Sequence, residues 1–287
     1  MAARWLSAVA ADLADLVLPT GCAGCGGPAV GPPEPKLRGS QARSSPLAEP
    51  SEPGLRGSQA RSSPLAGARY GVCAACVTAV TTLRPYGTRP EPAPAALPPC
   101  VALGDYGGAL RELVLAYKDR GRHRLALPLG RLLAVAVAEL TAGPAVLGPV
   151  PDTAAAARER HGDHLWRLAR SAADRLRAAG TPVVLARPVR ALPRPDSAGL
   201  DTAARAAAAG AGFAPRPARL RALWRLAAGR QVILLDDVVT TGATLAAVSR
   251  LLADGGVPVG GAAVLAATRR TRPARVRADG DRSDSHR

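Results

Sequence analysis

The sequence predicts an α/β fold in which a mainly parallel sheet is flanked by helices. In residues 101–268, short apolar runs alternate with Ala- and Leu-rich stretches that have helical spacing. Strands separated by helices usually run parallel, because the chain crosses back over the sheet before the next strand begins. The chain has 287 residues, 47% of them hydrophobic, so it can form one large domain or one domain with a smaller module.

The elements of this domain are expected in a regular order along the chain. Pro151 ends the first expected strand, and Gly180 stops the helix before the second one, as glycine often does. In chain order we expect helices over Arg111–Tyr117 and Leu125–Leu140, a strand over Ala145–Val150, a helix over Arg160–Ala179, strands over Pro182–Ala186 and Val232–Leu235, a helix over Thr244–Asp254 and a strand over Val257–Ala266.

Residues 1–100 and 269–287 differ in composition from the domain between them. The first region is expected to begin with an amphipathic helix over residues 1–19, because its apolar residues recur at helical spacing. Residues 31–67 hold the segment LRGSQARSSPLA twice, at 37–48 and 55–66. Such polar repeats offer no apolar face, so we expect 31–67 to be a flexible insertion. Residues 269–287 are Arg-, Asp- and Ser-rich, and we expect a disordered basic tail.

Charge and hydropathy narrow the class of protein. The net charge of +16 favours phosphorylated or polyanionic partners, although many of the arginines are expected to be solvated surface residues. No apolar run reaches the roughly 20 residues that a membrane helix needs, and Asp12 and Asp15 interrupt the N-terminal one. We therefore expect a cytoplasmic protein that does not insert into membranes. Its oligomeric state is left open.

Four cysteines form two pairs with metal-knuckle spacing. Cys22 and Cys25 make one C-x-x-C pair, and Cys73 and Cys76 make the other. In a reducing compartment such pairs indicate a tetrahedral, structural Zn²⁺ site rather than disulfides; the alternative is a metal-free pair of reduced knuckles. The long gap between the pairs is compatible with one site, because doubling a loop costs only about 0.6 kcal/mol. Cys100 is expected to be a small buried residue outside this set.

The strongest candidate site follows the apolar strand that ends at Leu235. The acids Asp236 and Asp237 come directly after it, and a Thr- and Gly-rich loop leads into the next helix. Free amides at a helix start bind phosphate, whereas carboxylates accept hydrogen bonds from sugar hydroxyls or from hydrated Mg²⁺. A site with hydrogen-bond donors for a phosphate beside acceptors for sugar hydroxyls suits a ribose 5-phosphate. The phosphate-binding set is expected to comprise Thr240, Thr241, Gly242, Ala243 and Thr244.

Residues 232–244 resemble the phosphoribosyl-diphosphate (PRPP) signature of type I phosphoribosyltransferases. Four apolar residues, two acids, two apolar residues and Thr-Thr-Gly-x-Thr follow one another without a gap. The resemblance implies that Asp236 and Asp237 hold the ribose hydroxyls, that the Thr-Gly loop holds the 5-phosphate, and that Mg²⁺ accompanies PRPP. Asp236 and Asp237 therefore count among the catalytic candidates as well.

With its four-cysteine module, the chain as a whole is similar to the ComF family, which is associated with DNA uptake in naturally competent bacteria. The segment at residues 105–121 fits that family, and the segment at residues 158–164 aligns loosely with its Arg-Glu-Arg-Gly-Phe-Asn-Gln stretch. The resemblance implies a type I phosphoribosyltransferase-like domain over residues 101–268 and an N-terminal zinc-knuckle module. It also implies that Lys118, Arg158 and Arg160 neutralise a leaving diphosphate. His164 is expected to be a surface or packing residue.

Three functions remain open from the sequence. The first is an enzyme that transfers phosphoribosyl from PRPP to an unidentified base. The second is a non-catalytic competence factor that binds single-stranded DNA and the uptake machinery, although aromatics make up only 3% of the chain and Trp166 and Trp224 are expected in the core. The third is a PRPP sensor without either activity.

Overall fold

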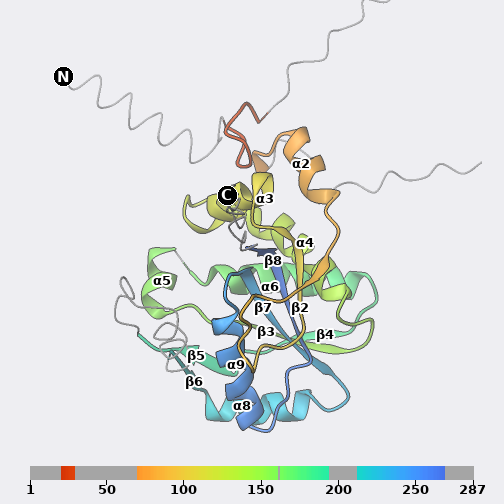
Figure 1. Ribbon diagram of the computed structural model, residues 1–287, viewed down its shortest axis with the longest axis vertical. Helices are drawn as coiled ribbons and strands as arrows, with labels where there is room; N and C mark the ends of the chain where they lie inside the picture. The colour runs from red at the N-terminus through yellow and green to blue at the C-terminus, as the bar shows by residue number, and fades with distance from the viewer. Residues whose placement is uncertain (1–20, 30–69, 161, 194–211, 269–287) are drawn as a thin grey trace, which may run out of the picture.

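The computed structural model describes residues 21–29, 70–160, 162–193 and 212–268 (Figure 1). The expected N-terminal helix, the repeat insertion at 31–67 and the C-terminal tail lie outside these residues.

A six-stranded sheet forms the centre of the structure (Figure 1). All neighbouring strands pair in parallel except the edge strand β1, which pairs antiparallel with β2. The mainly parallel fold that the sequence predicts is therefore confirmed. Across the sheet the order is β1 (Tyr86–Thr88), β2 (Cys100–Asp105), β8 (Gly261–Ala267), β7 (Gln231–Val239), β3 (Ala145–Pro149) and β4 (Val183–Leu185).

Helices cover the sheet on both sides, as Figure 1 shows, with α4 and α6 on one side and α8 and α9 on the other. A small second sheet pairs β5 (Val189–Ala191) with β6 (Phe213–Pro215). The described helices are α2 (Ala74–Thr81), α3 (Gly108–Lys118), the 3₁₀ turn η2 (His123–Leu125), α4 (Ala126–Ala138), α5 (Ala154–Glu159), α6 (His164–Ala178), α8 (Pro217–Leu226) and α9 (Ala243–Asp254).

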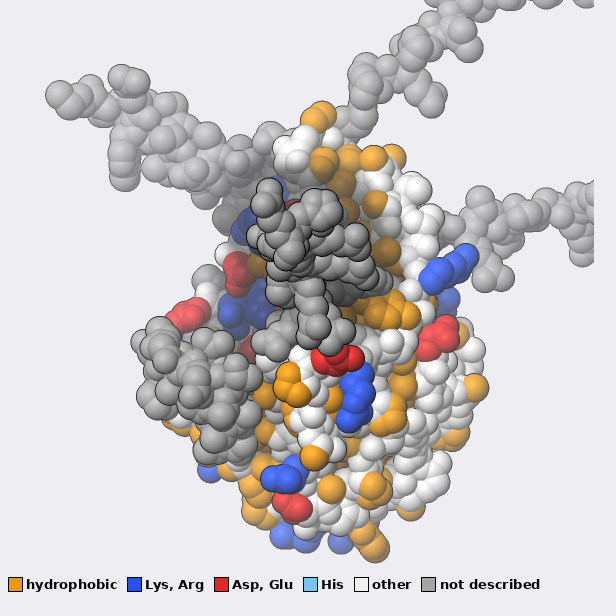
Figure 2. All heavy atoms as spheres, in the orientation of Figure 1, with side chains coloured by type: hydrophobic (Ala, Val, Ile, Leu, Met, Phe, Trp, Pro, Cys, Tyr) orange, Lys and Arg blue, Asp and Glu red, His pale blue; other side chains and the backbone are white. Residues whose placement is uncertain are grey.

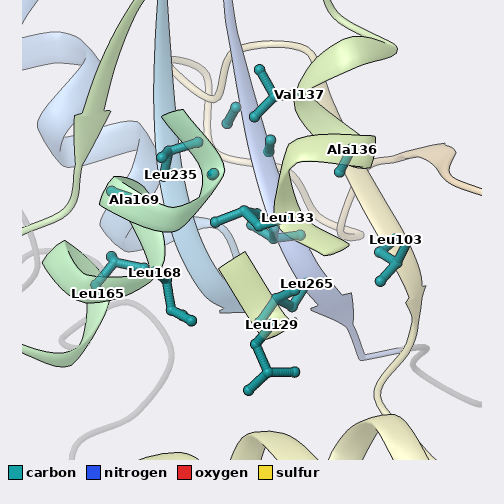
Figure 3. Close-up of a cluster of buried hydrophobic side chains, with 14 of the residues drawn as sticks. Leu103, Leu129, Leu133, Ala136, Val137, Leu165, Leu168, Ala169, Leu235 and Leu265 are labelled. Atoms are coloured by element: carbon teal, nitrogen blue, oxygen red, sulfur yellow. The ribbon is translucent and has the colours of Figure 1, made fainter. Parts of the chain in front are cut away.

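The core lies between the sheet and the helices α4 and α6. Leu133 of α4 and Leu168 of α6 meet Leu235 of β7 and Leu265 of β8 there (Figure 3), and all four are fully buried. The central strands are buried on both faces, as expected for parallel strands between two helical layers. This packing fixes β7, and with it the acids near its end.

The predicted strand at residues 232–235 is too short. β7 continues through Asp236 and Asp237 to Val239, because Val238 and Val239 go on pairing with β8 in the register set by Leu234 and Leu235. The acids therefore lie inside a strand, not after it.

The predicted helix over Arg160–Ala179 corresponds to α6, which begins only at His164, and a separate short helix that was not predicted, α5, precedes it. Thr153 caps α5 through the amide of Ala156, at 3.2 Å, and Asp163 caps α6 through the amide of Trp166, at 2.8 Å. Each cap satisfies an amide that a helix start leaves without a partner, so two helices form with a short break between them.

The two tryptophans that were expected in the core, Trp166 and Trp224, are not both there. Trp166 of α6 is partly buried and stacks under the guanidinium of Arg187, 4.0 Å from the ring centroid. Trp224 of α8 is 63% exposed, so the expectation that it packs in the core is wrong. Only Leu223 of this helix is buried, because α8 lies on the outside of the molecule.

Candidate functional site

The loop between β7 and α9 is open to solvent. Thr240 and Thr241 are exposed, and Gly242 has a left-handed backbone with φ of 73°. This conformation turns the chain so that α9 begins at Ala243, whose amide also donates to Thr241 Oγ1 over 3.3 Å. The first amides of a helix carry partial positive charge and suit an anion. The geometry suits a phosphate group, and we name residues 240–244 the phosphate loop.

Asp236 and Asp237 project from opposite faces of the sheet. Side chains alternate along a strand, and β7 keeps its register with β8 through this stretch, so no bulge disturbs the alternation. Asp237 shares the face of Leu235, under α6, and is 5% exposed. Asp236 shares the face of Val238 and is half-buried.

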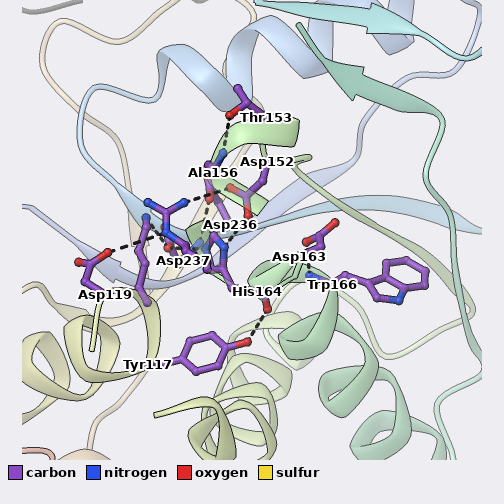
Figure 4. A network of polar contacts seen from close by, with 12 residues as sticks. Tyr117, Asp119, Asp152, Thr153, Ala156, Asp163, His164, Trp166, Asp236 and Asp237 are labelled. Carbon is purple, nitrogen blue, oxygen red and sulfur yellow. Dashed lines mark hydrogen bonds and ion pairs between the residues drawn. The ribbon is translucent and has the colours of Figure 1, made fainter. Parts of the chain in front are cut away.

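Two cations contact the same oxygen of Asp237 (Figure 4). Lys118 Nζ, at the end of α3, lies 2.7 Å from Asp237 Oδ2, and His164 Nε2, at the start of α6, lies 3.1 Å from it. The hydroxyl of Tyr117 donates to the carbonyl oxygen of His164 over 2.6 Å and so ties α3 to α6. A buried carboxylate thus receives the two cationic partners that burial of a charge requires.

Further charges extend this cluster through Asp152. His164 Nδ1 lies 2.5 Å from Asp152 Oδ2, and Arg160 Nη1 lies 3.7 Å from Asp152 Oδ1. Arg160 Nε lies 3.9 Å from Asp119 Oδ1. Charges of opposite sign therefore alternate around a closed circuit. This charge circuit consists of Asp119, Arg160, Asp152, His164, Asp237 and Lys118, and is closed by the peptide bond between Lys118 and Asp119.

The circuit shifts the ionisation of its buried members. Burial opposes a charge on His164, but hydrogen bonds to Asp152 and Asp237 raise its pKa to about 9. Burial likewise opposes ionisation of Asp237, yet the contacts of His164 and Lys118 hold its pKa well below the usual range. At neutral pH His164 is therefore a cation and Asp237 an anion.

The pKa of Asp236 is shifted in the opposite direction to that of Asp237. Burial, and the charge of Asp237 next to it, raise the pKa of Asp236 to about 7. One of its oxygens, Oδ1, accepts a hydrogen bond from the amide of Asp237 at 2.9 Å. Within the described residues no ion pair involves Asp236.

The structure brings together some of the candidate residues from the sequence. Lys118 and Arg160 lie in the circuit with Asp237, and the loop from Thr240 to Thr244 follows on the same strand. Arg158 is exposed at the end of α5, and no described partner forms an ion pair with it.

Sequence reasoning missed three residues of the circuit. His164 is not a surface or ordinary packing residue but the link between two carboxylates. Asp119 and Asp152 are not among the candidates from the sequence. A signal existed for Asp152, because it follows β3, and the ends of neighbouring parallel strands such as β3 and β7 meet at one edge of the sheet.

The two cysteine pairs meet in space. The sulfur atoms of Cys22, Cys25, Cys73 and Cys76 all lie within 4.8 Å of one another, so the predicted cluster is confirmed. Gly24 makes the close approach possible, because a Cβ at this position would lie 2.8 Å from the Cys76 sulfur. Cys100 is buried apart from the cluster, as expected.

The donor set fits zinc. A tetrahedral Zn²⁺ with bonds of ~2.3 Å to sulfur places its ligands about 3.8 Å apart, and the sulfurs of Cys25 and Cys73 are 3.8 Å apart. Burial opposes ionisation of Cys22, but the amides of Cys73 and Gly24 donate to its sulfur at 3.2 and 3.3 Å and lower its pKa to about 6. One thiolate is therefore already formed for a metal.

Among the described residues, no helix combines the length and the apolar character needed to span a bilayer.

Comparison with known proteins bears on the C-terminal part of the chain. No curated protein matches the sequence. A family model described as the phosphoribosyl transferase domain matches residues 198–285, a stretch that includes β7, the phosphate loop and α9. Residues 198–285 are therefore similar to a phosphoribosyl transferase domain, and the mainly parallel sheet to which β7 belongs is consistent with this similarity.

Proposed function

We propose that the protein binds PRPP at Asp236–Thr244. The observation that carries the proposal is the direct succession of a carboxylate strand, an exposed Thr-Thr-Gly loop and a helix start. The phosphoribosyl transferase match over residues 198–285 supports it.

The 5-phosphate would bind the loop. The amides at the start of α9 and the hydroxyls of Thr240, Thr241 and Thr244 are donors, which is what a phosphate needs. Gly242 carries no Cβ, so the backbone can approach the phosphate oxygens closely.

The ribose hydroxyls would bind the acids at the end of β7, which are acceptors. Mg²⁺ would reach the site with the diphosphate of PRPP and neutralise part of its charge, keeping several of its own waters. Lys118 contacts Asp237 and Arg160 belongs to the same charge circuit, and they would attract the diphosphate into the site, with Arg158 as the third candidate.

If the domain is active, the reaction is a phosphoribosyl transfer. A nitrogen of an acceptor base would attack the anomeric carbon, the bond from that carbon to the diphosphate oxygen would break, and diphosphate would leave. Cations at the leaving group lower the barrier by stabilising the charge that develops there. The sensor function remains the case in which PRPP binds and no transfer follows.

Calorimetric titration with PRPP and Mg²⁺ tests the binding proposal. We expect the wild-type protein to bind and the double variant Asp236→Asn with Asp237→Asn to lose at least tenfold in affinity, because the acceptors lose their charge. A folded double variant, judged by circular dichroism, that binds PRPP as the wild type does would refute the assignment. Release of diphosphate with a panel of bases separates an enzyme from a sensor.

We propose further that the four-cysteine cluster holds a structural Zn²⁺. Zinc would join the segment around Cys22 to the start of α2, and this module contacts α3, since Gly24 lies against Ala109. The metal would supply cross-linking of the chain and no part of the chemistry.

One observation favours a second function, the binding of single-stranded DNA as a competence factor of the ComF type. Trp224 is exposed on α8 between the exposed arginines Arg221 and Arg225, and Figure 2 shows basic side chains at the end of the molecule where α8 lies. An exposed ring can stack on a base while the arginines contact phosphates.

Fluorescence anisotropy with a labelled oligonucleotide tests this second function. We expect Trp224→Ala to weaken binding about tenfold, from the ~1–3 kcal/mol that one stacked base contributes, and raising the salt to weaken it steeply. Ala222→Ser, at an exposed position on the other side of α8, is the control. Equal binding by wild type and Trp224→Ala would exclude this surface.

A further inference from the structure

We propose that the two acids of β7 have separate roles. Asp236 alone offers its carboxylate to the ligand, while Asp237 anchors Lys118, and His164 is the positioning residue that holds Asp237 in this role. The inference rests on the proposed function and divides a pair of residues that the sequence treats as equivalent.

The side chains of Asp236 and Asp237 point in opposite directions. Because β7 is regular through Asp236 and Asp237, the two carboxylates leave the sheet on opposite faces. Asp237 continues the row of Leu235, which is buried under α6, and it is 5% exposed. Asp236 continues the row of Val238, and both of these residues are partly buried. A single sugar ring can therefore reach Asp236 far more easily than Asp237.

The carboxylate of Asp237 already has partners within the protein. Oδ2 of Asp237 already accepts from Lys118 at 2.7 Å and contacts His164 at 3.1 Å. Turning this carboxylate toward a ligand would break both contacts and leave two charges without their partner inside the protein. Among the described residues, Asp236 has no ion pair to break, and Oδ1 accepts its hydrogen bond from a backbone amide, that of Asp237.

His164 acts on the ligand only indirectly. Its ring is 4% exposed, and both of its nitrogens are engaged, Nδ1 with Asp152 and Nε2 with Asp237. His164 has no free donor to offer a ligand. It can only fix the orientation of Asp237, in the way that a buried partner orients the group that does the binding.

The separate roles of Asp236 and Asp237 imply a role for Lys118. Asp237 holds the ammonium group at the end of α3, 28% exposed, where it is accessible to an anion from solvent. Arg160 is held less tightly, at 3.7 and 3.9 Å from its two carboxylates. The anchored cation therefore serves the diphosphate, while Asp236 serves the hydroxyls.

Two ligands and two single variants separate these roles. Ribose 5-phosphate lacks the diphosphate, so its affinity reports on the loop and on the acid that meets the hydroxyls. We expect Asp236→Asn to weaken ribose 5-phosphate and PRPP alike, by about tenfold. Asp237→Asn should weaken ribose 5-phosphate less than threefold and PRPP more than tenfold, because only PRPP uses Lys118. Equal losses of ribose 5-phosphate affinity in the two variants would overturn the division.

His164 is tested by a conservative and a non-conservative variant. Gln can still donate one hydrogen bond to Asp237, so His164→Gln should keep most of the PRPP affinity, whereas His164→Ala should behave as Asp237→Asn does. A purely structural role would lower stability in both variants without the contrast between PRPP and ribose 5-phosphate. Failure of His164→Ala to show this contrast would remove His164 from the proposal.

Nuclear magnetic resonance of ¹⁵N-labelled histidine gives a readout that needs no ligand. We expect the wild-type protein at neutral pH to show His164 with protons on both ring nitrogens, and Asp237→Asn to shift the Nε2 resonance toward that of a free imidazole. An unchanged resonance would refute the anchoring contact. If this shift is seen but neither ligand binds the wild type, the proposed function fails together with the role of Asp236, and the contact of His164 with Asp237 stands.

Discussion

Leu97 packs directly against Gly242 in the phosphate loop. A Cβ placed on Gly242 would lie 3.0 Å from both Cδ atoms of Leu97, and the glycine also has φ of 73°. The loop is therefore shaped by a residue that lies well before it in the chain and outside the matched family segment.

We expect Gly242→Ala to lower the free energy of unfolding by about 1–2 kcal/mol, the usual cost of a left-handed backbone for a residue with a Cβ. Urea denaturation measures it. Leu97→Ala makes space but does not relieve the backbone strain, so Gly242→Ala should cost about as much in the Leu97→Ala background as in the wild type. Loss of this cost in the Leu97→Ala background would show that the contact, and not the dihedral angle, is limiting.

The hydroxyl of Tyr117 should contribute measurably to stability. It donates to the carbonyl oxygen of His164 at 2.6 Å and is buried, so Tyr117→Phe removes a buried hydrogen bond. We expect a loss of about 0.5–1.5 kcal/mol in thermal or urea unfolding. Tyr86→Phe is the matched control, because its hydrogen bond to Asp105 is exposed. A similar loss in both variants would contradict the assignment.

Stability should depend on pH through His164. Its pKa is raised from 6.5 to about 9 in the folded protein, so the stabilisation is fully present below pH 6.5 and is lost as the pH rises through 9. The shift corresponds to about 3 kcal/mol, at 1.36 kcal/mol per pKa unit. The difference in unfolding free energy between wild type and His164→Gln, measured by urea denaturation from pH 6 to pH 10, should fall by roughly this amount. A constant difference across this range would mean that His164 is neutral in the folded state.

Metal content tests the cysteine cluster. We expect one Zn²⁺ per chain by elemental analysis, and Co²⁺ reconstitution should give the absorption bands of a tetrahedral thiolate site. Cys73→Ser should abolish both, since three thiolates no longer close the site. Cys100→Ser leaves all four ligands and should retain the metal. Stoichiometric metal in Cys73→Ser would disprove the four-cysteine site.

Local pattern is enough to predict several features of this protein. The alternation of apolar runs predicts the parallel sheet, and the spacing within each C-x-x-C pair predicts a metal knuckle, because each pattern lies within a short stretch of chain. Once two such knuckles are present, the cluster follows although the pairs are 48 positions apart. The motif at Asp236–Thr244 gives the loop and helix start for the same reason.

Local pattern does not predict the partners of Asp237. Lys118 lies 119 positions away along the chain and His164 lies 73 positions away, so only the packing of α3 and α6 over β7 brings them to one oxygen atom. The continuation of β7 through the acids was missed for a related reason. Charged residues are rare in buried strands, and here cations from two helices make such a placement tolerable.

The charge circuit has one consequence for how the protein can vary. With His164 protonated, its three acids and three bases sum to zero, so replacing one member by a neutral residue leaves an excess charge that the other five cannot neutralise. Replacing neighbours together, as in Asp152→Asn with His164→Gln, removes one charge of each sign. Members of this set should therefore change in pairs rather than singly.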